Sequence, residues 1–132
     1  MAVRLSASLA NALADQVDAT LGNAGTIKIY TGSQPATADT AASGTLLATF
    51  TLGSPGFGVA SGGTITLTGT PLTVAAAATG TAGWFRMATS GGTTILDGSV
   101  GTSGQQINLN TTSITSGVNV TITSGTITMP TS

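Results

Sequence analysis

Hydrophobic residues recur at every fourth position in the first part of the chain and at every second position in the rest. The first pattern comprises Leu5, Leu9, Leu13, Val17 and Leu21. This spacing is typical of an amphipathic helix, here of roughly 17 residues, with one apolar stripe. Ser6 or Ser8 is suited to cap its start, and Gly22 and Asn23 are suited to end it because both residue types tolerate a left-handed backbone.

The apolar stripe of this helix requires a surface to cover it, since burying one leucine contributes about 1.5–3 kcal/mol. That surface is either the rest of the same domain or a neighbouring subunit, and the sequence leaves both open. A secretory signal is a further alternative, because Arg4 precedes a mildly apolar stretch. The stretch is short and is interrupted by Ser6, Ser8 and Asn11, so we favour a helix that belongs to the folded protein.

The rest of the chain alternates between apolar and polar residues, as strands with one buried face do. Ile27 and Ile29 begin the alternation, and Thr, a β-branched residue that favours strands, occurs 27 times. The apolar residues of the last segment lie at even positions up to Ile122 and at odd positions from Ile127 onwards. This change predicts a bulge or tight turn near Gly125. Residues 90–92, Ser-Gly-Gly, predict a hairpin turn.

The spacing of these segments indicates about eight to ten short strands. We therefore expect a helical segment over residues 1–24 and a single β domain over residues 25–132. The predicted fold class is all-β, an antiparallel β-sandwich or jelly-roll-like domain with one N-terminal amphipathic α-helix.

The composition excludes several classes of function. The chain of 132 residues has three basic and four acidic side chains, no Cys and no His. Disulfide scaffolds, Cys/His zinc sites and histidine-based catalysis are therefore excluded. Three cations cannot neutralise a run of phosphates, which argues against nucleic acid and against an anionic membrane surface. We expect a protein that is not an enzyme and that uses no cofactor and no metal.

The few acidic and aromatic residues have plain structural interpretations. Asp15 and Asp18 share a face of the predicted helix, and we expect that face to be solvated. Asp97 precedes Gly98, which predicts a turn. Trp84 could stack on a sugar together with Tyr30, although packing in the core or at an interface is the favoured interpretation.

The scarcity of charge also bears on assembly. A net charge near zero favours association, and exposed strand edges are normally protected by charged residues. Few such residues are present here, so we expect the protein to be covered by other subunits, as a homo-oligomer with a trimer favoured. The candidate interface residues are those of the helix stripe and an aromatic pair, namely Leu5, Leu9, Leu13, Val17, Trp84 and Phe85.

Three stretches resemble a small protein that is widespread among tailed bacteriophages and prophages. They are GTIKIYTGSQPATADTAASGTLLATFTLGSPGFG (25–58), TGTAGWFRMATSGGTTILDGSVG (79–101) and INLNTTSITSGVNVTITSGTITMP (107–130). The most specific segments are IYTGSQPATAD and GTAGWFR. The resemblance implies a structural protein of the virion, and it supplies no catalytic residues.

These observations together lead to the expected function. We expect a capsid decoration (cement) protein on the outer surface of the virion, whose main partner is the major capsid protein and which bridges neighbouring capsid subunits. A tail or neck component, such as a tube, collar or fibre-attachment protein, is the first alternative. A carbohydrate-binding module for adhesion to the host is the second.

Overall fold

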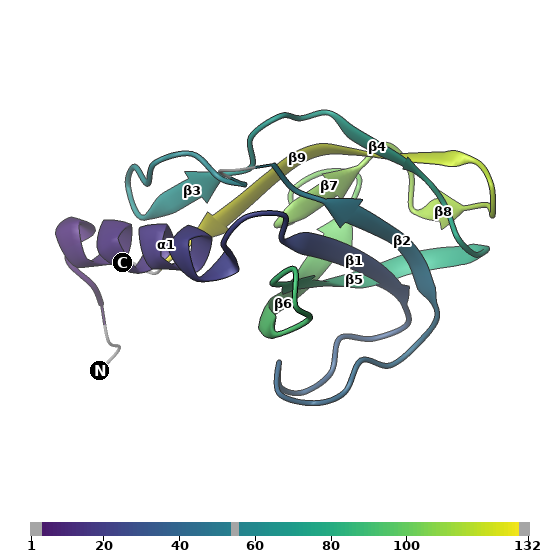
Figure 1. Cartoon of the computed structure of the whole chain (residues 1–132), viewed down its shortest axis with the longest axis horizontal. Helices are drawn as coiled ribbons and strands as arrows, with labels where there is room; N and C mark the ends of the chain where they lie inside the picture. The colour runs from purple at the N-terminus through teal and green to yellow at the C-terminus, as the bar shows by residue number, and fades with distance from the viewer. Residues whose placement is uncertain (1–3, 54–55, 130–132) are drawn as a thin grey trace.

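One helix precedes nine strands in the computed structural model, which describes residues 4–53 and 56–129 (Figure 1). The helix α1 spans Ala7–Leu21. The strands are β1 (Thr26–Thr31), β2 (Leu46–Thr51), β3 (Thr64–Thr66), β4 (Leu72–Ala75), β5 (Gly80–Ala88), β6 (Thr94–Gly101), β7 (Ile107–Leu109), β8 (Ser113–Ile114) and β9 (Asn119–Thr128). The predicted all-β fold with one N-terminal helix is confirmed.

The strands form one curled sheet in the order β2-β1-β5-β6-β7-β9-β3, with β4 added to β9 and β8 added to β5 (Figure 1). Neighbouring strands run antiparallel except β6 and β7, which run parallel over two residue pairs. The sequence predicts antiparallel pairing throughout, and this contact differs from that prediction. β7 pairs over three residues with β9 and over only two with β6, so its antiparallel contact is the longer one.

Both ends of α1 are fixed by the residues that the sequence indicated. The hydroxyl of Ser6 accepts a hydrogen bond of 3.1 Å from the backbone N–H of Leu9, as an N-cap does. Gly22 follows the last helical residue with φ of 70°, and its N–H donates to the carbonyl of Asp18 at 3.1 Å. The helix is therefore 15 residues long and begins and ends at capping residues.

The main core combines buried residues of the strands with residues of the helix. Ala14 and Leu21 of α1 belong to the same buried cluster as the inward-facing residues of the strands. The largest fully buried members of that cluster are Phe50, Phe57, Phe85, Leu21, Ile27, Ile29, Leu47, Ile65, Met87, Ile107 and Leu109. The helix is thus packed on the β domain.

The inward-facing residues of the long strand β9 change from even-numbered to odd-numbered positions at a β-bulge. Leu109 of β7 lies opposite Ile122, whereas the residue before Leu109 lies opposite Ser124. Thr123 is therefore an extra residue on β9. The predicted change of parity is confirmed, and it falls two residues before Gly125.

The predicted hairpin turn at residues 90–92 is also confirmed, and it joins β5 to β6. The backbone N–H of Thr89 donates to the carbonyl of Thr93, and that of Gly92 donates to the carbonyl of Thr89, both at 2.9 Å. Gly92 has φ of 93°, which favours glycine at this position.

Candidate interaction surface

Trp84 and Phe85 are both fully buried, although the sequence suggested them as contacts for a partner. They are neighbours on β5 and therefore face opposite sides of the sheet. Phe85 belongs to the main core. Trp84 stacks on Tyr30, with ring centroids 4.7 Å apart and ring planes inclined by 15°. The prediction that this pair contacts a partner is wrong, because β5 is covered on both faces, and Trp84 has no exposed ring face for a sugar.

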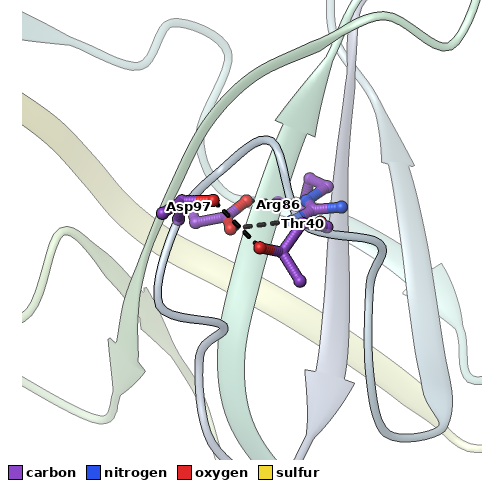
Figure 2. A network of polar contacts seen from close by, with 4 residues as sticks. Thr40, Arg86 and Asp97 are labelled. Atoms are coloured by element: carbon purple, nitrogen blue, oxygen red, sulfur yellow. Dashed lines mark hydrogen bonds and ion pairs between the residues drawn. The ribbon is translucent and has the colours of Figure 1, made fainter.

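The face of β5 that carries Trp84 also holds an ion pair between Arg86 and Asp97 (Figure 2). Nε and Nη2 of Arg86 donate to the two carboxylate oxygens at 2.7 and 2.9 Å, and Nη2 also donates to the carbonyl of Thr40 at 2.7 Å. The guanidinium carbon lies 5.3 Å from the centre of the Trp84 ring, within reach of a cation–π interaction. This network ties β5 and β6 to the segment that connects β1 to β2.

The role of this network is structural, because the two side chains are only 9% and 2% exposed. The hydrogen bond with Asp97 raises the pKa of Arg86 against the opposing effect of burial. Asp97 lies within β6 and not in a turn, so that prediction is corrected. The following glycine is needed because the ring of Phe85 occupies the space that a side chain at Gly98 would fill.

One polar face of α1 attaches the helix to the connection between β2 and β3. The Oδ1 atoms of Asn11, Asp15 and Asp18 accept hydrogen bonds of 2.7, 2.8 and 3.1 Å from the backbone N–H groups of residues 63, 60 and 57. The expectation of a merely solvated face at Asp15 and Asp18 is therefore corrected. The signal in the sequence is their spacing with Asn11, at intervals of four and three residues, which places all three side chains on one face of the helix.

Attachment through this polar face leaves the middle of the apolar stripe facing outwards. Leu9 and Leu13 are 48% and 41% exposed. Leu5 and Val17 are half-buried, and Leu21 is buried. The close contact with the domain is made by the small residues Ala10 and Ala14 instead. Leu9 and Leu13 are therefore exposed apolar side chains in the single chain, whereas Val17 and Leu21 pack against its core.

A shallow groove of about 290 Å³ continues this surface on to the start of β6. All six residues that line it are uncharged: Leu13, Gln16, Val17, Thr20, Thr94 and Ile95. We call Leu5, Leu9, Leu13, Val17 and Ile95 the helix surface. Its apolar side chains and uncharged surroundings suit burial against another protein surface.

Residues 4–53 and 56–129 contain no group of three or more Asp, Glu, His or Cys side chains that could hold a metal ion. The same part of the chain includes no helix with the length and apolar character needed to cross a bilayer. Comparison with protein families, curated proteins and solved structures gives no match to the chain.

Proposed function

We propose that this chain is a structural protein of a tailed-bacteriophage particle. In this proposal it is a decoration protein that binds the outer surface of the capsid, as a trimer, and bridges neighbouring capsid subunits. The observation that carries the proposal is the exposed helix surface, in which Leu9 and Leu13 remain 48% and 41% exposed on a chain with few charges.

The distribution of charge supports burial of the surface against other subunits. Arg86 and Asp97 neutralise each other inside the molecule, so two of the few charged side chains are withdrawn from the surface. Asp15 and Asp18 accept hydrogen bonds from their own chain. A surface dominated by hydroxyl and small apolar groups can be buried without the desolvation cost of ions.

A decoration protein stabilises a shell through many weak contacts. Each molecule bridges subunits that are already held in a lattice, so the contacts act at high effective concentration. No single strong site is required for this mechanism. An uncharged apolar strip such as the helix surface suits it, and the resemblance to small phage proteins supports the same proposal.

The test is to count copies of this protein in purified phage particles by quantitative mass spectrometry, relative to the major capsid protein. Hundreds of copies, together with density on the outer capsid surface in electron micrographs, would support the proposal. A few dozen copies or fewer at one vertex would favour a neck or tail component instead. Absence of the protein from the particles would show that the proposal is wrong.

A further inference from the structure

The curled sheet opens between β6 and β9, on the N-terminal side of β7. A cavity of about 560 Å³ lies there, lined by residues 96–99 of β6, residues 104–106, residues 126–128 of β9 and Gln34 from the connection between β1 and β2. β6 pairs with β7 only at its last two residues, Val100 and Gly101. In the described structure, the earlier residues of β6 have no neighbouring strand on this edge. We call this cavity the strand slot.

The backbone of β6 presents hydrogen-bonding groups to the strand slot. The N–H of Ser99 donates to Oε1 of Gln106 at 3.1 Å, so it points away from β5. Backbone groups of alternate residues point to the same edge of a strand. The N–H and C=O of Asp97 therefore also point into the slot.

The facing edge of β9 is arranged in the same way. The N–H of Thr126 donates to the carbonyl of Gln106 at 2.9 Å, so it points away from β3. By the same alternation, the N–H and C=O of Thr128 point into the slot. Two strand edges with free pairing capacity thus face one cavity.

Gln106 occupies the closed end of the slot and already bridges both edges. Its carbonyl accepts from Thr126 of β9, and its side-chain Oε1 accepts from both the N–H and the hydroxyl of Ser99. The continuation of β7 beyond this residue would lie between β6 and β9. An added strand in that place would make backbone hydrogen bonds on both of its edges.

We propose that the strand slot binds an extended peptide segment of a partner protein, which adds a strand in line with β7. The added strand runs parallel to β6 and antiparallel to β9. Residues 126–128 of β9 line the slot and span about 10 Å of extended chain. A segment of three to five residues therefore fills the site. This inference goes beyond the proposed function, because it concerns a different surface and a different kind of contact.

The lining of the slot determines the chemistry of its occupant. The carboxylate of Asp97 is 2% exposed and neutralised by Arg86, and the other lining groups are amides, hydroxyls, glycine and aliphatic side chains. An uncharged segment therefore complements the slot, whereas an inward-facing ion would be desolvated without a partner.

The occupant comes from a different polypeptide. All nine described strands are already paired within their own fold. A second copy of this chain could donate one of these strands only by breaking its pairing. A different protein with an extended arm has no such cost.

The experiment uses the isotope-labelled full chain and the capped peptide acetyl-GTVTVTG-amide as the probe. Amide hydrogen exchange is followed by NMR at Asp97 and Thr128. The matched control is the same peptide with the three threonine nitrogens methylated, which removes the donors along one edge of the added strand. We expect the unmethylated peptide to slow exchange at both amides at least about tenfold, and the methylated peptide to leave exchange unchanged.

A variant of β9 tests whether the peptide pairs with the edge of β9 that faces the slot. Thr128→Pro removes an N–H that points into the slot, together with the hydroxyl contact of 2.8 Å between Thr128 and Thr64 of β3. Thr128→Val is the matched control, because it removes that hydroxyl contact and keeps the N–H. We expect both variants to fold and the protection of Asp97 by the peptide to be lost only in Thr128→Pro. If Thr128→Pro does not fold, the comparison of the two peptides on the natural chain still tests whether the slot binds an added strand.

Equal protection by both peptides, or no slowing at either amide, would overturn the proposal. Slowing that rises with protein concentration in the absence of peptide would show that a second copy fills the slot, and would overturn the assignment to a different polypeptide. None of these results depends on phage particles, so failure here is distinct from failure of the proposed function.

Discussion

The guanidinium of Arg86 and the carboxylate of Asp97 meet in two parallel hydrogen bonds of 2.7 and 2.9 Å between adjacent strands. Their backbones are directly opposite each other in the β5–β6 pairing. A third bond, from Arg86 to the carbonyl of Thr40, extends the contact to the segment that covers this face (Figure 2). The pair therefore connects three separate parts of the chain.

Removing one member of this pair should destabilise the fold strongly. We expect Asp97→Ala to lower the free energy of unfolding by about 3–5 kcal/mol, because it leaves a buried guanidinium without its counter-ion. The double variant Arg86→Met with Asp97→Leu should recover much of that loss. Urea unfolding measures both variants, and a double variant less stable than Asp97→Ala would contradict this account.

The same pair predicts how stability depends on pH. The folded state raises the pKa of Arg86, so the stabilisation is fully present below the pKa of the unfolded state and is lost as the pH rises through the folded-state pKa. Both values lie in the strongly alkaline range. We therefore expect the difference in unfolding free energy between the natural chain and Arg86→Met to stay constant from neutral to mildly alkaline pH, measured by urea unfolding at each pH.

Gly98 should not accept a side chain. A Cβ at this position would lie 2.4 Å from Cε1 of Phe85, the residue opposite it on β5. We expect Gly98→Ala to cost about 1–3 kcal/mol through overpacking. Combining it with Phe85→Leu, which removes the obstructing ring, should give a smaller total loss than the sum of the single losses, measured by thermal unfolding.

The attachment of α1 through its polar face predicts a graded response at Asp18. We expect Asp18→Ala to cost about 1–2 kcal/mol, because it leaves the N–H of Phe57 without its acceptor. Asp18→Asn retains an acceptor oxygen and should lose less. Gln16→Ala is the control, since its side chain bonds to exposed Thr20 on the same helix. Thermal unfolding and exchange of the Phe57 amide measure the effect.

The helix surface should drive association. We expect Leu9→Lys with Leu13→Lys to reduce self-association, or binding to capsids, with little change in stability, because both side chains are exposed. Val118→Lys is the matched control, since Val118 is 56% exposed and precedes β9 at the far end of the molecule from α1 (Figure 1). Light scattering after size-exclusion chromatography measures the mass, and a natural chain that is monomeric at high concentration would contradict this prediction.

That association should also depend little on salt. An apolar, uncharged contact offers few ion pairs for salt to screen. We expect the mass of the natural chain to be similar at low and high ionic strength. A steep fall in mass with added salt would show that the interface is ionic.

The fold was largely predictable because its signals are local. Ser6 and Gly22 mark the ends of the helix, alternation marks the strands, and the parity change near Gly125 marks the bulge. The pairing order could not be predicted, because the sequence does not say which strands become neighbours. The parallel contact between β6 and β7 depends on such non-local packing.

The candidate site was only partly predictable. The apolar stripe was evident from its spacing, but its orientation depends on hydrogen bonds from Asp15 and Asp18 to backbone groups far along the chain. The sequence left open whether Trp84 packs in the core or at an interface with a partner. The choice depends on Tyr30 and on the segment that covers this face, and an aromatic residue does not show from sequence which face is covered.

The bulge at Thr123 accommodates one residue of β9 that has no partner on β7. Without this residue, Ile122 and Ser124 would be consecutive and would still lie opposite Leu109 and Asn108, so regular alternation would keep Ile127 inward and Thr128 outward. The end of the molecule that holds α1, β3 and the strand slot would therefore keep its alignment. We expect related chains to tolerate the loss of one residue at this place in β9, whereas a deletion elsewhere in the strand would move its apolar residues to the wrong face.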